Sequence, residues 1–464
     1  MFEKLANIFR VPDLRKRVLF TLAMLAVYRL GSHIPTPGIN AAALQRLFEQ
    51  SRGSFLGLLD MFNGGNIRRL TIFALGIMPY ITASIILQLL TVVYEPLAKL
   101  QKEGELGRKK ITQWTRYLTV VLSALQSLGI GYALTRSSGD VALVANPGPG
   151  FLLMCMITLT AGSVFIMWLG EQITERGVGN GMSLMIFAGI VAGLPRGVAD
   201  LWDKIKNDAW GSFTPIAVAA LIVLMVLVVA FIVYVERSER RIRVEYAKRV
   251  VGRRVMGGQS THLPLRVNAG GVMPVIFASS ILTFPAMIGG NALQHNRYFG
   301  PVIEALKWGE PLYTLLYALG IIFFAYFYVS IVFNPNEVAD NMRKYGGFVP
   351  GIRPGKRTAD YINEILTRIT LVGGLYLILI SLIPEWMIAG IHLNHLPGAI
   401  GNFFERFPTW VTNGLGVNFY FGGTSLLIVV GVAMDTIQQV ESQLIMRHYE
   451  GFTPRSGRIK ARRW

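Results

Sequence analysis

Long apolar segments alternate with short polar segments along most of the chain. Runs of about 18–25 apolar residues, enough to cross ~30 Å of hydrocarbon as a helix, recur throughout. This pattern predicts an all-α membrane protein with ten spans. The predicted spans are 18–37, 71–93, 117–135, 149–170, 181–195, 213–235, 269–289, 312–333, 369–389 and 421–440. The first and fifth are marginal in length, and an internal repeat supports them.

Two sequence patterns each occur twice. Residues 76–86 and 271–281 share Gly-x-Met-Pro-x-Ile-x-Ala-Ser-x-Ile, and residues 181–186 and 423–428 share Gly-x-Ser-Leu-x-Ile. Copies that follow in the same order indicate a membrane protein with two related halves and a path between them. Because five spans per half is an odd number, the second half is inverted relative to the first.

The two halves are predicted to meet near Pro195. The N-terminal half would cover 1–200 and the C-terminal half 201–464, with the boundary in a loop near 196–212, where polar residues interrupt the apolar pattern.

The repeated positions place bulky apolar side chains at related depths on four helices. Ile77 and Ile81, like Met182 and Ile186, are four apart and so share one helix face, and Ile276 and Ile428 are the mates of Ile81 and Ile186 in the other half. We predict a constriction that excludes water and ions when closed. The alternative is ordinary core or lipid-facing packing, although lipid-facing positions have little reason to match across the halves. The predicted ring is Ile77, Ile81, Met182, Ile186, Ile276 and Ile428.

One apolar segment, within 53–70, is too short to span and contains Asp60. A turn at 63–66 follows it. Irregular backbone at membrane depth persists where it is buried in protein or lines a water-filled cavity, which favours a re-entrant half-helix in an outer funnel. An amphipathic helix on the outer surface is the alternative.

The prolines of the first repeat are predicted to weaken their helices. Pro79 and Pro274 each remove a backbone donor, and Gly76 and Gly271 lie three residues before them. Paired weak points would suit a moving gate, whereas glycines that only allow close packing are the alternative.

Positive charge is concentrated on one side of the predicted topology. The chain carries 45 Lys and Arg against 27 Asp and Glu, and roughly 33 of the cations fall on the side of both termini. This distribution places the termini in the cytoplasm. The basic loops 236–267 and 334–368 then either set topology and bind anionic lipid, or dock RNA phosphate or an acidic protein surface.

Motifs for several kinds of catalysis are absent from the sequence. There is no phosphate-binding Gly-x-x-x-x-Gly-Lys-Ser/Thr loop and no His-Glu-x-x-His. His392 and His395 lack further evident ligands for zinc, and Cys155 is the only cysteine. Arg29 and Asp435 are the main ionisable residues predicted inside spans, and neither belongs to a repeat. We therefore expect a passive conduit without metal or cofactor.

Four stretches resemble the bacterial SecY family, the channel subunits of the Sec protein translocon. They are Ile-Phe-Ala-Leu-Gly-Ile-Met-Pro-Tyr-Ile at 72–81, Gly-Glu-Gln-Ile-Thr-Glu-Arg-Gly at 170–177, Gln-Ser-Thr-His-Leu-Pro at 259–264 and Phe-Val-Pro-Gly-Ile-Arg-Pro-Gly at 348–355. The resemblance covers essentially the whole chain. Met182 departs from the isoleucine common in the family, and the outer loop near 385–420 is longer than expected.

The resemblance implies an hourglass channel with the ring above, a plug at about 57–67 and a lateral gate. The implied plug residues are Leu58, Leu59, Met61, Phe62, Asn63, Gly64 and Gly65. The implied gate residues are Ile85, Gln88, Leu89, Ser279, Ser280, Thr283 and Phe284. The implied partner-binding residues are Arg353 for the SecA motor, Arg241, Arg253 and Arg254 for the ribosome, and Arg357.

By the same resemblance, the chain would be a non-enzymatic, multi-pass protein of the bacterial inner membrane. It would pass secretory polypeptides across the membrane and release membrane segments sideways. SecE, SecG, SecA, the ribosome, the translocating polypeptide, anionic lipid, YidC and SecDF are the expected partners. An ion-coupled secondary transporter with inverted repeats and a structural scaffold are the alternatives.

Overall fold

The computed structural model describes most of the chain. The described residues are 11–40, 43–44, 63–136, 143–144, 146–206, 214–246, 249–251, 254–256, 260–282, 305, 310–388 and 423–450. Most of the long outer loop 385–420 and the C-terminal residues 451–464 lie outside them.

A described helix coincides with each of the ten predicted spans. The first five are α2 (Pro12–Gly31), α5 (Met78–Val93), α7 (Glu105–Arg136), α8 (Pro149–Arg176) and α9 (Gly181–Lys206). The second five are α10 (Thr214–Glu236), the helix Met273–Leu282, α13 (Pro311–Val332), α15 (Lys356–Ile388) and α18 (Gly423–Glu450). Six of the described helices are long and apolar enough to span a membrane on their own. A seventh span results if α5 is joined to α6 (Glu95–Lys102), which is bent from it by 104°.

Several helix boundaries differ from the predicted spans. The residues 71–77 form turns, so α5 begins seven residues later than the predicted span. In the other direction, α9 continues through Pro195 to Lys206, so the predicted loop at 196–206 is wrong. The helices α7 and α15 also extend into segments predicted as loops. Apolarity marks the part of a helix that lies in lipid, whereas the helix itself runs on into water.

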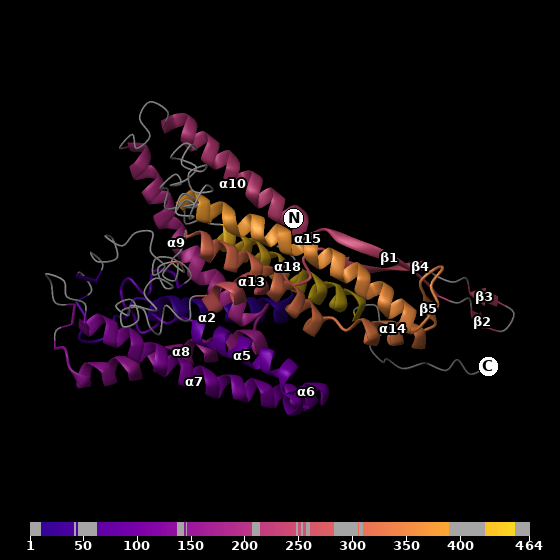
Figure 1. Ribbon diagram of the computed structural model, residues 1–464, viewed down its shortest axis with the longest axis horizontal. Coiled ribbons are helices and arrows are strands. Elements are labelled where there is room, and N and C mark those ends of the chain that lie inside the picture. Colours follow the sequence, from indigo (N-terminus) through magenta and orange to yellow (C-terminus); the bar gives the residue numbers. More distant parts are fainter. Residues whose placement is uncertain are drawn as a thin grey trace, which may run out of the picture.

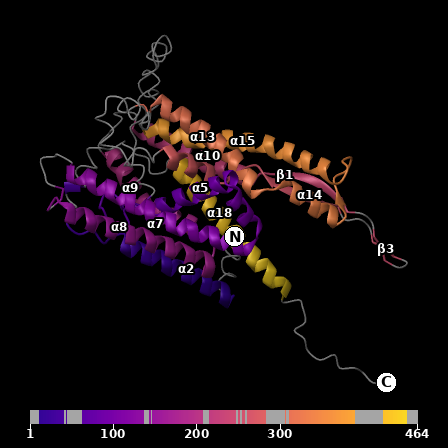
Figure 2. The same cartoon turned by 60° about the horizontal axis from the view of Figure 1, so that its bottom comes forward.

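The helices pack in two groups around a shared core. Figure 1 shows α5, α7 and α8 on one side of the molecule and α10, α13 and α15 on the other. In Figure 2 the helices α2, α7 and α8 lie together, away from α13 and α15. The helices α9 and α18 contact one another and join the groups.

Short strands lie beyond the helix ends, in the two predicted basic loops. A three-stranded antiparallel sheet has the order β4-β1-β5, with β1 (Glu239–Tyr246), β4 (Ser260–Arg266) and β5 (Gly347–Phe348). The strands β2 (Arg249–Val251) and β3 (Arg254–Met256) form a separate hairpin. This sheet, α6 and α14 (Pro335–Lys344) gather at one end of the molecule (Figure 1). Because β1 pairs with both β4 and β5, one sheet joins the two loops.

Candidate functional site

All six predicted ring residues belong to one hydrophobic cluster. Ile77 and Ile81 come from the start of α5, and Met182 and Ile186 from the start of α9, while Ile276 and Ile428 come from the helix Met273–Leu282 and α18. Ile77, Ile81, Ile186 and Ile428 are buried, whereas Met182 and Ile276 are partly buried. Four helices separated in sequence therefore bring these side chains into one apolar region.

The two copies of the first repeat have the same backbone geometry. Gly76 has φ 58° and Gly271 has φ 57°, a left-handed conformation that glycine adopts without a Cβ penalty. Each glycine ends a series of turns, and each helix begins two residues later. Pro79 and Pro274 are therefore second residues of helices, where the missing N–H has no helical partner to lose. The expectation that these prolines weaken their helices is wrong.

The described end of the predicted plug packs beneath the start of α5. The Asn63 side-chain amide donates to the carbonyl oxygen of Ala74 at 2.9 Å, and this asparagine is buried. A Cβ placed on Gly64 would lie 2.7 Å from the carbonyl oxygen of Gly189 on α9. Asn63 therefore packs against the turns that precede α5, and Gly64 packs against α9.

The other predicted plug residues, Leu58, Leu59, Met61 and Phe62, lie outside the described residues. The choice between a re-entrant half-helix and a surface helix therefore stays a prediction.

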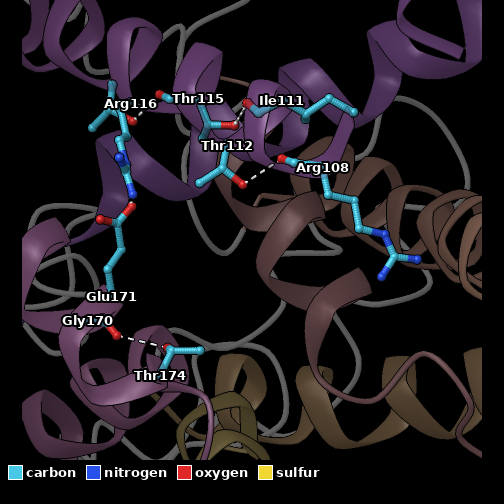
Figure 3. A network of polar contacts seen from close by, with 9 residues as sticks. Arg108, Ile111, Thr112, Thr115, Arg116, Gly170, Glu171 and Thr174 are labelled. Carbon is cyan, nitrogen blue, oxygen red and sulfur yellow. Dashed lines mark hydrogen bonds and ion pairs between the residues drawn. The ribbon is translucent and has the colours of Figure 1, made fainter. Parts of the chain in front are cut away.

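The turn between α8 and α9 fixes the position of Met182. The Thr174 hydroxyl oxygen accepts a hydrogen bond from the Gly181 amide at 2.9 Å and donates to the Gly170 carbonyl. A Cβ on Gly181 would overlap that carbonyl oxygen, so only glycine allows this approach. One turn away on α8, Glu171 accepts from Arg116 of α7 at 2.8 Å, which Figure 3 shows as a bridge between the two helices.

The described gate residues follow two helices of the same cluster. Ile85 is buried and Leu89 packs against the cluster, both on α5. The Gln88 amide donates to the Ser84 hydroxyl at 3.3 Å. On the helix Met273–Leu282, Ser279 donates to the Ile276 carbonyl and Ser280 is buried. Thr283 and Phe284 lie outside the described residues.

The predicted partner-binding arginines lie at the sheet end of the molecule. Arg353 and Arg357 are exposed, and Arg353 occupies a turn between Gly351 and Gly355, which have φ 80° and 107°. The Thr358 hydroxyl donates to the Arg353 carbonyl and closes this turn. Arg241 is exposed on β1, Arg254 lies in β3, and Arg253 is outside the described residues.

Among the residues that the structure describes, no group of three His, Cys, Asp or Glu side chains is placed to hold a metal ion. Cys155 is buried. Asp435, predicted inside a span, is exposed and lies 3.4 Å from Arg266.

Sequence reasoning missed a polar cluster in which Asn268 donates to Glu236 at 2.7 Å. The available signal was a glutamate at the end of an apolar run and an asparagine three residues before Gly271.

Comparison with known proteins identifies the family. The SecY family model matches residues 71–437. The chain belongs to the SecY family. The SecY translocase subunit of Escherichia coli K12 is 50% identical over 441 residues, covering 94% of this chain and 93% of its relative. SecY of Streptomyces galbus is 47% identical and covers 97% of this chain and 100% of its own length.

Solved channels share the fold at low sequence identity. A protein-conducting channel structure aligns with TM-score 0.62 and 16% identity over 95% of both chains. Canine Sec61, solved in a ribosome-channel complex, aligns with TM-score 0.58 and 16% identity over 95% of both chains. The ten-helix architecture predicted from the apolar runs and repeats, and the hourglass fold implied by the resemblance, are confirmed. As a SecY protein, the chain is a multi-pass membrane subunit of a protein-conducting translocase.

Proposed function

We propose that the six ring residues form the constriction through which an unfolded polypeptide passes. The observation that carries this proposal is the convergence of Ile77, Ile81, Met182, Ile186, Ile276 and Ile428, from four helices, on one apolar region. Bulky apolar side chains bind no passing residue strongly, so they conform around many sequences and close again behind them. Asn63, packed against the turns before α5, and Gly64, packed against α9, support a plug that covers this ring.

A lateral gate lies between α5 and the helix Met273–Leu282. Partitioning into lipid decides which segments leave sideways, because about 20 apolar residues gain free energy there. A charge at the centre of such a segment costs about 2.5–3.5 kcal/mol on insertion scales. Two observations support this assignment. The apolar side chains Ile85 and Leu89 lie on α5 in the hydrophobic cluster, and Ser279 and Ser280 lie on the opposite helix.

The chain has two five-span halves related by inversion, with the division after α9, and both termini lie in the cytoplasm. The membrane is the bacterial inner membrane, because the similar translocase subunits come from bacteria. SecE and SecG are its companion subunits, and anionic lipid, YidC and SecDF associate with it.

The exposed arginines at the sheet end dock partners. Arg353 and Arg357 serve the SecA motor, and Arg241, Arg253 and Arg254 serve the ribosome. The exposure of Arg241, Arg353 and Arg357 and the ribosome complex of the canine relative support this assignment. The partner supplies the energy, and the chain itself catalyses no reaction.

The test is transport into vesicles that contain the chain with its companion subunits. We expect a secretory precursor to become protected from added protease when the motor and ATP are present, and to stay accessible without ATP. Vesicles that protect no precursor but exchange a labelled small solute against its unlabelled form would contradict the proposal and favour the secondary transporter.

A further inference from the structure

A polar cluster lies where the cytoplasmic sheet meets the membrane helices. The side-chain amide of Asn268 donates to the Glu236 carboxylate at 2.7 Å and to the Gly271 carbonyl oxygen at 3.1 Å. Asn268 is buried, with 6% of its surface exposed. Glu236 is the last residue of α10, and Gly271 precedes the helix that carries Ile276. One side chain therefore joins the end of α10 to the start of a ring helix.

The neighbouring Arg266 extends this cluster to α18. Its guanidinium group lies 3.4 Å from the Asp435 carboxylate and donates to the Gln438 side chain. Asp435 and Gln438 lie on the helix that carries Ile428. Arg266 is also the last residue of β4, opposite Glu239 of β1. The end of the sheet is thus bound to the two ring helices of the C-terminal half.

The backbone around this cluster is packed closely. The Val267 amide donates to the Ser238 carbonyl at 3.0 Å, which closes the base of the β1–β4 hairpin. A Cβ on Gly373 of α15 would lie 2.7 Å from the Val267 carbonyl oxygen, and a Cβ on Gly431 of α18 would lie 2.9 Å from the Val272 side chain. The base of the sheet is therefore in close contact with α15, and the segment that follows it is in close contact with α18.

We infer that Asn268 and Arg266 are positioning residues that couple the cytoplasmic sheet to the helices carrying Ile276 and Ile428. A partner that docks on the sheet and shifts it moves both helices through these contacts. Since β5 belongs to the same sheet, docking at the loop of Arg353 acts through the same cluster. The inference rests on the proposed function in one respect, namely that partners dock on this sheet.

Loss of the Asn268 contacts is expected to affect transport more than loss of the Arg266 contacts. Asn268 is buried and satisfies a half-buried carboxylate, and leaving such a group unpaired is costly. Arg266 and Asp435 have 47% and 63% of their side chains exposed, and exposed ion pairs contribute little. We therefore expect Asn268→Asp to lower motor-driven transport about tenfold, and Arg266→Ala about threefold.

The experiment compares transport with partner binding in vesicles that contain the complete channel. For Asn268→Asp, we expect the transport rate to fall while the affinity for the motor stays within about twofold of the original. Adding Glu236→Gln exchanges donor and acceptor across the contact with α10, but an aspartate at 268 cannot donate to the Gly271 carbonyl. This pair is therefore expected to regain part of the transport rate and to stay below the original. For Arg266→Ala, the matched control is Lys99→Ala, which removes an exposed cation paired with Glu95 at 3.1 Å within α6, outside the sheet, and is expected to leave transport unchanged.

Three results would overturn the inference. They are unchanged transport in Asn268→Asp, equal losses of motor affinity and transport, and full recovery of transport on adding Glu236→Gln, which would show that the contact with the Gly271 carbonyl carries no coupling. Failure of the proposed function looks different, because the unaltered chain would then transport no precursor at all.

Discussion

The turns that begin the two repeated helices have the same backbone but different neighbours. Gly76 and Gly271 adopt nearly equal φ angles, and a proline follows each at the second position of the helix. A Cβ on Gly76 would overlap the side chain of Asn63, whereas a Cβ on Gly271 would meet nothing within 4 Å. The first turn is packed against the plug segment, and the second is open at its glycine.

This difference shows which features of the two turns come from the repeated residues and which come from residues outside the repeat. The repeated residues specify a helix start and an apolar side chain in the ring. The residues outside the repeat specify what each start is attached to. Asn63 ties the first to the turn at 63–66, and Asn268 ties the second to α10 beside the cytoplasmic sheet. Two related helices are therefore joined to two different segments, the turn at 63–66 and the polar contacts at the end of α10.

The largest effect on transport is expected from Arg353, in the proposed docking loop. Arg353→Glu reverses an exposed charge on a turn linked to the sheet through β5, so motor-driven export should fall at least tenfold. Insertion of membrane proteins by the ribosome route should stay largely intact. Both routes are measured in the same vesicles, with Lys344→Glu on α14 as the control for charge reversal alone. Equal loss of both routes would assign Arg353 a structural role.

A second prediction tests the two glycines directly. Gly76→Ala forces a Cβ into a left-handed backbone and against Asn63, so we expect a loss of about 2–4 kcal/mol in unfolding free energy. Gly271→Ala imposes the backbone strain alone, at a cost of about 1–2 kcal/mol. Thermal unfolding of the purified complex measures both.

Because Asn63→Ala removes the overlapping side chain, it should cost less in the Gly76→Ala background than in the original chain. Equal costs at the two glycines would show that their surroundings are equivalent.

The smallest expected effect is a change in sealing. Ile81→Asn and Ile276→Asn introduce polar amides into the apolar cluster, so together they should hydrate the ring and raise ion leak across planar bilayers. The buried Ile81 should contribute more than the partly buried Ile276. Val92→Asn, at an exposed position of α5, serves as the control. Unchanged leak in the double variant would contradict the ring assignment.

Apolar runs and repeats predicted the ten helices and grouped the ring residues, because membrane helices must be apolar over their whole span. The same signal misplaced helix boundaries, since residues 71–77 are apolar yet turn at Gly76, and Pro195 lies inside α9 without ending it. Glu236 and Asn268 could be noticed in the sequence, but nothing in it paired Asn268 with Glu236 or Arg266 with Asp435, because these contacts join segments far apart and carry no spacing pattern.

The central claim is that a polypeptide passes through the apolar ring, and a photocrosslink from Ile81 tests it most directly. A photoreactive residue replaces Ile81, and a secretory chain is stalled during transport into vesicles. The account predicts a crosslink between the two that requires both the stalled chain and the energy source. A stalled chain that crosslinks only from other faces of α5, and never from position 81, would contradict it.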